Sequence, residues 1–183
     1  MSEKPSVVLG VTGSIAAYKA AELTRLMMKR GWDVWVMMTE SATQYVGPLT
    51  FQALTGHPVA TGRFEKIDTS TYQHLDLAGR AKVLVIAPCT ANVLAKVARG
   101  LADDIVSATV LACRAPVLIA PAMNENMWIN AATQENVATV KRRGLCVLDV
   151  ESGELACGVT GAGRLCSLEK IVEVVHGVLA SKN

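Results

Sequence analysis

The stretch from Pro116 to Trp128 reads P-V-L-I-A-P-A-M-N-E-N-M-W. Its first five residues form a short apolar run, which predicts a buried strand of a parallel sheet. In open α/β sheets, ligands bind beyond the carboxyl ends of the strands, and Asn124 follows this strand closely. The Asn124 amide is therefore a candidate to hold a carboxylate or a ring carbonyl, with Met123 and Met127 packing against a flat ligand. A helix that begins at an asparagine cap and buries two methionines explains the same spacing, and on spacing alone it is the commoner outcome.

Short apolar runs alternate with helix-like stretches along the rest of the chain. The apolar runs predict five strands, at residues 7–11, 33–38, 83–87, 116–120 and 146–150. Helices are predicted at residues 16–30, 41–44 (with Ser41 opening a capping box), 48–56, 75–80, 91–99, 103–112, 131–143 and 168–180. This alternation predicts an α/β fold, a Rossmann-like or flavodoxin-like doubly wound parallel sheet, in a single domain over residues 1–183.

Two segments lack a regular period. Residues 58–73 mix glycine, hydroxyl and charged residues and predict a loop. Residues from about 151 to 165 are rich in glycine, which predicts a mobile flap without regular structure. This flap contains Cys157 and Arg164, and a thiol on a flap can act as a proton donor or a nucleophile when a ligand folds it in.

The composition limits the classes of protein that the chain can represent. Its 183 residues, 51% hydrophobic and 19% charged, suit one domain with an aliphatic core. A net charge of +2 is too small to indicate a nucleic-acid partner, and no apolar run is long enough to span a membrane. Because little charged surface is available, we expect a homo-oligomer. The polar residues between positions 10 and 14 interrupt the apolar N-terminus, which argues against a signal peptide and favours a cytoplasmic protein.

The cysteines are odd in number and include no close C-x-x-C pair. They are Cys89, Cys113, Cys146, Cys157 and Cys166. This pattern argues against a disulfide framework and against a zinc site, so we expect no metal. The neighbouring Asp103 and Asp104 are expected to favour the start of a helix.

The first strand-to-helix turn, residues 10–16, contains Gly13 and Ser14. It has neither the G-x-G-x-x-G spacing of a dinucleotide site nor the G-K-[ST] of a Walker loop. Backbone N–H groups and the Ser14 hydroxyl would suit a single phosphate at the helix N-terminus. A tight turn capped by a serine explains the same residues equally well.

Two further strand ends carry small polar groups. These are Thr39 and Ser41 after the second strand, and Thr90 and Asn92 after the third. Strand ends with hydroxyls and amides but few charges predict a flat ligand with a phosphate tail, and FMN is the natural candidate. His74 opens a predicted helix after the irregular loop, where a lone histidine is more often solvated or capping than catalytic. His57 and His176 are expected to be structural.

Five motifs occur in order along the chain. They are G-S-I-A at 13–16, H-L-D-L-A at 74–78, A-P-C-T-A-N at 87–92, P-A-M-N-E-N-M-W at 121–128 and A-C-G-V-T-G-A-G-R at 156–164. In these motifs the chain resembles the homo-oligomeric flavin-containing cysteine decarboxylases, from about residue 7 to residue 175. The last two motifs are the specific ones. Cys89 stands where many members carry another small or apolar residue, which does not matter if only the backbone is used there.

The resemblance implies a Rossmann-like subunit that binds FMN at a subunit interface of a homotrimer or dodecamer. It implies oxidative decarboxylation of a cysteine-ended substrate, with 4'-phosphopantothenoylcysteine of coenzyme A biosynthesis as the expected one. His74 would be the base of the oxidative step, Asn124 would bind the substrate carboxylate, and Cys157 would be the acid that protonates the intermediate. The residues that would hold FMN are Gly13, Ser14, Ile15, Thr39, Ser41, Thr90, Ala91, Asn92 and Ala122.

Two other functions remain open within this resemblance. One is decarboxylation of a C-terminal peptidyl-cysteine in lantibiotic maturation, although those relatives generally lack the A-C-G flap found at residues 156–158. The other is a non-catalytic FMN-binding regulatory protein that inhibits a phosphatase, a role that tolerates loss of the histidine or the flap cysteine. Some relatives continue into a synthetase domain, so both a monofunctional enzyme and the first domain of a bifunctional protein fit the sequence.

Overall fold

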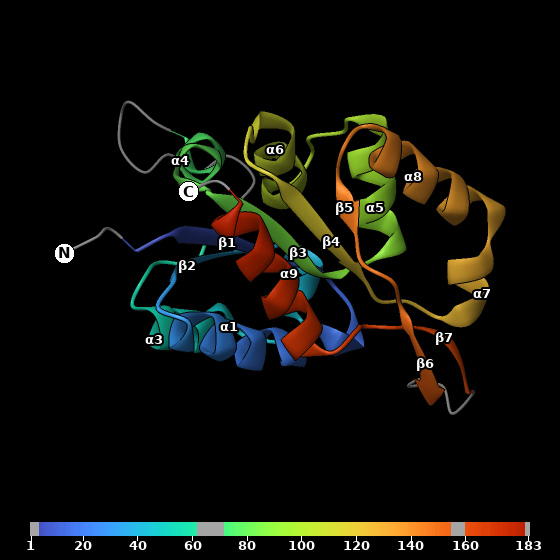
Figure 1. Ribbon diagram of the computed structural model, residues 1–183, viewed down its shortest axis with the longest axis horizontal. Coiled ribbons are helices and arrows are strands. Elements are labelled where there is room, and N and C mark those ends of the chain that lie inside the picture. Colours follow the sequence, from blue (N-terminus) through green and yellow to red (C-terminus); the bar gives the residue numbers. More distant parts are fainter. Residues whose placement is uncertain (1–3, 62–71, 155–159, 182–183) are drawn as a thin grey trace.

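A five-stranded parallel sheet forms the centre of the computed structural model, which describes residues 4–61, 72–154 and 160–181 (Figure 1). Its strands are β1 (Ser6–Val11), β2 (Asp33–Met38), β3 (Val83–Cys89), β4 (Val117–Pro121) and β5 (Cys146–Val147). They lie in the order β2-β1-β3-β4-β5, and each neighbouring pair is parallel. This is the flavodoxin-like order of a doubly wound sheet, so the predicted fold class is confirmed.

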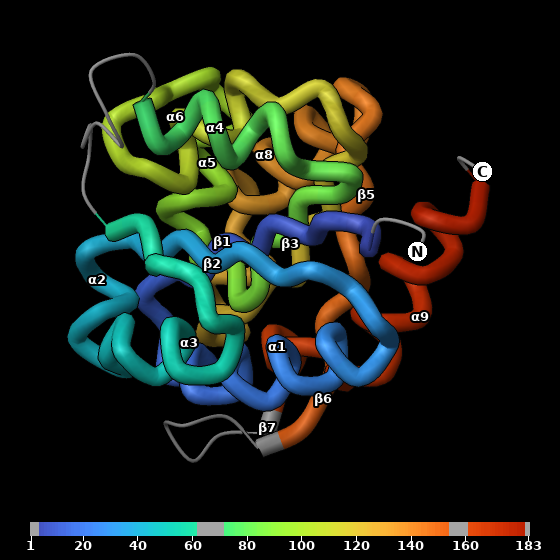
Figure 2. Tube along the Cα trace, turned by 90° about the vertical axis from the view of Figure 1, so that its left-hand side faces the viewer, coloured from blue at the N-terminus to red at the C-terminus, as the bar shows by residue number. Residues whose placement is uncertain are grey.

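Helices cover both faces of the sheet (Figures 1 and 2). On one face lie α1 (Lys19–Lys29), α3 (Pro48–Thr55) and α9 (Leu168–Ala180). On the other lie α4 (Gln73–Arg80), α5 (Ala91–Arg99), α6 (Ile105–Ala112) and α8 (Ala131–Arg142). Three shorter helices follow strands directly or nearly so: the 3-10 helix η1 (Ile15–Tyr18), α2 (Glu40–Thr43) and α7 (Glu125–Ile129).

The strands are buried on both sides because their residues alternate between two apolar clusters. In β1, Val7 and Leu9 belong to the cluster that includes α1, α3 and α9, whereas Val8 belongs to the cluster that includes α4, α5, α6 and α8. All three side chains are fully buried. A strand covered on both faces needs an unbroken apolar run, and this is the pattern that identified the strands in the sequence.

The glycine-rich segment contains regular structure, so its prediction as a flap without any was wrong. Residues Glu151–Glu154 form β6 and residues Thr160–Arg164 form β7, and the two strands pair antiparallel. The connecting residues 155–159, which include Cys157, lie outside the described residues, as do residues 62–71 of the predicted loop. The strand predicted at 146–150 is also shorter, although the Leu148 N–H still donates to the Ile119 carbonyl oxygen at 2.9 Å.

Side-chain caps decide where several helices begin. Thr39, and not Ser41, caps α2, so the capping box expected at Ser41 is wrong and Ser41 lies inside the helix. Asp104 caps α6 in a capping box with Ser107, as expected for an acidic residue at a helix start. Among the residues that the structure describes, no helix is long and apolar enough to cross a membrane.

Candidate functional site

Three strand-to-helix turns lie side by side at the carboxyl ends of β2, β1 and β3. Each has a hydroxyl cap: Ser14 for η1, Thr39 for α2 and Thr90 for α5, accepting a backbone N–H at 3.3, 3.2 and 3.3 Å. The first turns of helices have unpaired N–H groups that favour anions. The three turns predicted from sequence therefore meet at one edge of the sheet, in an environment that suits a phosphate.

Thr12 connects the turn after β1 to the turn after β3. Its side chain is fully buried, its Oγ1 donates to the Pro88 carbonyl oxygen at 2.7 Å, and it accepts the Thr90 N–H at 3.0 Å. Thr12 is not among the site residues predicted from the sequence. The available signal was a hydroxyl directly after a buried strand, but the partners lie far along the chain and become apparent only in the fold.

Gly13 allows the turn after β1 to approach α2 closely. A Cβ on Gly13 would lie 2.5 Å from the Ser41 Cβ and 3.1 Å from the Ser41 carbonyl carbon. The Thr39 N–H also donates to the Val11 carbonyl oxygen at 3.0 Å, which joins the ends of β1 and β2. Residue 13 must therefore lack a side chain, because Ser41 already occupies the space that a Cβ would need.

The remaining predicted cofactor residues differ in exposure. Ile15 is 58% exposed at the open edge, while Ala122 is buried and its N–H donates to the Cys89 carbonyl oxygen at 3.0 Å. Ala91 is half-buried and Asn92 is exposed at the start of α5. The edge therefore combines hydroxyls and backbone N–H groups with apolar surface, which suits a ligand with a phosphate end and a flat apolar end.

Asn124 lies beyond the carboxyl end of β4 and caps α7, as the simpler interpretation of the sequence expected. The burial of two methionines that this interpretation also expected is wrong, because Met127 is 48% exposed. The Asn124 Oδ1 accepts the Asn126 N–H at 2.9 Å. A carboxylate would be recognised instead by the two N–H donors on the amide nitrogen. The helix cap and carboxylate recognition therefore use different atoms of one side chain, and the structure is compatible with both.

His74 is the second residue of α4 and is half-buried, with its ring centroid 5.9 Å from that of Tyr72. α4 packs against β1 and α6, whereas α7 packs against α8 and β7. In Figure 1, α4 lies at the left, near β1 and β2, whereas α7 lies at the right, beyond β4 and β5. The structure of one chain therefore brings Asn124 to the edge formed by β3 and β4 but does not bring His74 there.

The far end of α4 is attached to β2 through an aromatic stack. The Trp35 ring stacks on His57 with 3.8 Å between centroids, and Arg80 Cζ lies 4.4 Å from the Trp35 centroid. Asp33 lies 2.7 Å from both His57 Nε2 and Trp35 Nε1. Burial alone would raise the pKa of Asp33, but these hydrogen bonds outweigh it and hold the pKa below its usual value. His57 therefore has a structural role, in the contacts that join β2 to the end of α4.

Of the cysteines that the sequence places in motifs, only Cys89 belongs to the described residues. Cys89 ends β3 and is fully buried, and burial raises the pKa of its thiol to about 12, so it stays protonated. Cys157, the predicted acid, falls outside the described residues. No group of three or more histidine, cysteine, aspartate or glutamate side chains in the described part of the chain could hold a metal ion.

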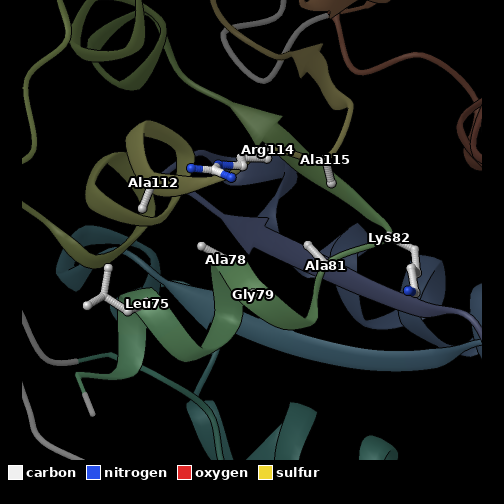
Figure 3. Close-up of a pocket in the computed structure, with 8 residues that line it drawn as sticks. All are labelled: Leu75, Ala78, Gly79, Ala81, Lys82, Ala112, Arg114 and Ala115. Carbon is white, nitrogen blue, oxygen red and sulfur yellow. The ribbon is translucent and has the colours of Figure 1, made fainter.

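A pocket of about 440 Å³ lies elsewhere, toward the amino ends of β3 and β4 (Figure 3). Its lining comes from α4, the end of α6 and the residues that lead into the two strands: Leu75, Ala78, Gly79, Ala81, Lys82, Ala112, Arg114 and Ala115. Because ligands of such sheets bind at the carboxyl ends, this pocket is separate from the candidate site.

Comparison with known proteins agrees with the fold and with the motifs. A family model described as Flavoprotein matches residues 1–180, and the chain belongs to this family. The resemblance drawn from the sequence is thereby confirmed.

Curated relatives are similar to the whole of this chain but are longer. The coenzyme A biosynthesis bifunctional protein CoaBC of Mycolicibacterium smegmatis is 46% identical over 179 residues, which cover 98% of this chain and 43% of the relative. The protein of the same name from Bacillus subtilis is 45% identical over 176 residues, covering 96% and 43%. The chain thus spans less than half the length of these relatives.

Solved structures share the fold over nearly their entire length. A cysteine-to-serine mutant of a PPC decarboxylase, complexed with pantothenoylaminoethenethiol, has a TM-score of 0.84 at 29% identity, covering 95% of this chain and 97% of that one. The FMN binding protein AtHal3 has a TM-score of 0.83 at 29% identity, covering 98% of both chains. The FMN-dependent cysteine decarboxylase SpaF has a TM-score of 0.81 at 32% identity, covering 95% and 97%.

Proposed function

We propose that this chain catalyses the FMN-dependent oxidative decarboxylation of 4'-phosphopantothenoylcysteine to 4'-phosphopantetheine, a step of coenzyme A biosynthesis. The observation that carries the proposal is the position of Asn124. Its turn follows β4 directly beside the Thr90 turn, and the Ala122 N–H joins the two through the Cys89 carbonyl oxygen at 3.0 Å. A carboxylate-binding amide therefore lies next to a phosphate-compatible edge. The names and similarity of the relatives support the same function.

The residues at this edge fit FMN. Gly13 lets the turn after β1 lie directly against Ser41 of α2, so the turns after β1 and β2 form one continuous edge. Three helices begin at this edge with hydroxyl caps, and the first turn of a helix suits a phosphate. The residues that would hold FMN are Gly13, Ser14, Ile15, Thr39, Ser41, Thr90, Ala91, Asn92 and Ala122. The chemistry that a bound FMN supplies is a reversible two-electron oxidation.

Each proposed catalytic residue has a separate task. Direct loss of CO₂ from a cysteine carboxylate would leave an unstabilised carbanion, whereas a thioaldehyde beside the carboxylate can accept the electron pair and become an enethiol. Asn124 holds the carboxylate through its amide N–H donors, and His74 removes the proton during oxidation. Cys157 then protonates the enethiol before reduction to the product.

We infer that the active form is a homo-oligomer, either a trimer or a dodecamer. The helix α4, which contains His74, and the helix α7, which Asn124 caps, lie far apart in Figure 1 and pack against different elements, so a site that uses both residues needs a second copy. Large apolar side chains are exposed on η1 and α3: Ile15 at 58%, Tyr18 at 61% and Leu49 at 73%. We place this oligomer in the cytoplasm, with no nucleic-acid or membrane partner. A light-scattering mass equal to one subunit with flavin still bound would contradict the oligomer.

The decisive experiment is incubation of the purified protein with 4'-phosphopantothenoylcysteine, following CO₂ and 4'-phosphopantetheine. We expect a yellow protein whose released chromophore has the mass of FMN, and one CO₂ for each product molecule. A peptide ending in cysteine serves as the competing substrate, because SpaF, which shares the fold, is named a cysteine decarboxylase. Turnover of the peptide alone would indicate the lantibiotic type of activity, and bound FMN without turnover of either would indicate a regulatory flavoprotein.

A further inference from the structure

The Asn124 turn is attached to β7 on both sides of the asparagine. Before it, the Met123 N–H donates to the Gly163 carbonyl oxygen at 2.9 Å. After it, Glu125 Oε1 accepts the Ala162 N–H at 3.2 Å, a contact across 37 positions of sequence. The second hydrogen bond is made by the Glu125 side chain. A substitution of Glu125 can therefore remove this bond without changing the backbone hydrogen bond of Met123.

Close packing accompanies these hydrogen bonds. A Cβ on Gly161 would collide with the Glu125 carboxylate, and a Cβ on Gly163 would collide with the Met123 carbonyl oxygen. Gly163 also has a φ of 133°, which favours glycine by itself. The φ of Gly161 does not require glycine. A side chain is excluded at Gly161 because the Glu125 carboxylate occupies the space.

The direction of the Asn124 amide depends on the backbone of this turn. Its Oδ1 is held by the Asn126 N–H at 2.9 Å, and this bond orients the N–H donors of the same amide. If the turn moved relative to β7, the donors would move with it. Catalytic groups displaced by about 1 Å can lose about a hundredfold in rate.

We propose that Glu125 is a positioning residue, whose carboxylate docks β7 on the Asn124 turn and thereby fixes the direction in which Asn124 meets the substrate carboxylate. This inference rests on the proposed function, because it requires Asn124 to bind that carboxylate. Glu125 acts through its contact with β7, and it touches no reacting atom.

The test compares Glu125→Ala with Glu125→Gln in the FMN-loaded protein. Alanine removes the acceptor for the Ala162 N–H, whereas the glutamine amide oxygen retains it. We expect Glu125→Ala to lower kcat/KM for 4'-phosphopantothenoylcysteine by about ten- to a hundredfold and Glu125→Gln to stay within about threefold of the unchanged protein. The inhibition constant of 4'-phosphopantetheine, which has no cysteine carboxylate, should not change. Hydrogen exchange at the Ala162 amide should quicken in the alanine variant alone.

Two further variants separate positioning from general damage. Gly161→Ala should reproduce the kinetic loss of Glu125→Ala, because its methyl group displaces the same carboxylate. Glu135→Ala, which removes an exposed glutamate paired with Arg99, should have no effect. In an Asn124→Ala background, Glu125→Ala should cause no further loss.

Each other outcome is decisive. Normal kcat/KM in Glu125→Ala, an equal loss of 4'-phosphopantetheine affinity, or additive effects with Asn124→Ala would each overturn the positioning role. If the protein without substitutions releases no CO₂ from 4'-phosphopantothenoylcysteine, the proposed function is wrong. The proposed role of Glu125 is then wrong as well, because it depends on that function.

Discussion

Thr12 and Thr90 are joined across 78 positions of sequence by a hydrogen bond from the Thr90 N–H to Thr12 Oγ1, at 3.0 Å. The same hydroxyl donates to the Pro88 carbonyl oxygen at 2.7 Å, so one buried atom satisfies two backbone groups at the candidate site. The relative position of the turns after β1 and β3 therefore depends on this side chain.

Thr12→Val tests this link, because valine has nearly the same shape but lacks the hydroxyl. The two backbone groups would lose their partner, and the free energy of unfolding should fall by about 2–3 kcal/mol. FMN affinity should fall as well, because the Thr90 turn is no longer held. Denaturant unfolding and flavin titration measure the two effects. Thr12→Ser retains the hydroxyl and serves as the control; a valine variant as stable as the serine one would disprove the link.

Gly13→Ala should weaken FMN binding by about tenfold or more, since its Cβ would lie 2.5 Å from the Ser41 Cβ. Flavin titration gives the affinity. Ser41→Gly removes the opposing Cβ, so the double variant should recover part of the loss, a non-additivity expected only of residues in contact. Strictly additive effects would mean that the two turns do not approach as the structure has them.

The sequence predicted the sheet well and the contacts between its ends poorly. Strands such as β1 are buried on both faces, so an unbroken apolar run identifies them without knowledge of their neighbours. The choice of Thr39 over Ser41 as the cap of α2 is different, because both hydroxyls occur within one turn of the helix start. Ser41 packs against Gly13 instead. The two residues are far apart in the sequence, so no local sequence pattern could predict this contact.

The antiparallel pair of β6 and β7 was not predicted, for a related physical reason. Glycines usually weaken strands, and their spacing indicated an irregular segment. In the fold, Gly161 and Gly163 let β7 approach the Asn124 turn, so their lack of side chains serves a contact with a distant segment. The candidate residues were found from the sequence, but their separation into a group at one edge and a distant His74 required the fold.

Cys89 and Cys146 should differ sharply in reactivity toward thiol reagents. Burial raises the pKa of Cys89 to about 12, so it has almost no thiolate at pH 8, whereas Cys146 is exposed. Mass mapping after brief alkylation should find Cys146 modified and Cys89 intact, and unfolding should equalise them. Since the folded pKa lies above the ordinary value of 9.0, stability from Cys89 should be lost as the pH rises above about 9. Rapid modification of native Cys89 would contradict its burial.

Asp33→Asn should destabilise the protein in a pH-dependent manner. The pKa of Asp33 is lowered in the fold, so its contribution is present above the ordinary value of 3.8 and is lost as the pH falls through the lower folded value. The difference in unfolding free energy between Asp33→Asn and the unchanged protein should therefore be steady from about pH 5 to 7 and shrink at more acidic pH. Urea unfolding at several pH values measures this, with Asp149→Asn as an exposed control. A difference that grows on acidification would refute the assignment.

The two proposed half-reactions can be separated by substituting Cys157 and His74. Cys157→Ser should still bind FMN and release CO₂ from 4'-phosphopantothenoylcysteine, but the enethiol should persist because a hydroxyl is a far weaker acid than a thiol. His74→Asn should slow CO₂ release by about a hundredfold or more, because the proton is no longer removed. Asn124→Asp should weaken binding of the substrate by setting a negative charge against its carboxylate, without removing flavin.

Stopped-flow absorbance of the flavin, together with mass analysis of the products, distinguishes these three variants. Cys146→Ser is the matched control, since it removes an exposed thiol outside the candidate site and should leave turnover unchanged. Subunits of His74→Asn and Asn124→Asp mixed in one oligomer should regain part of the activity if the site draws its residues from two chains. Formation of 4'-phosphopantetheine by Cys157→Ser at the normal rate would show that the cysteine is not the acid.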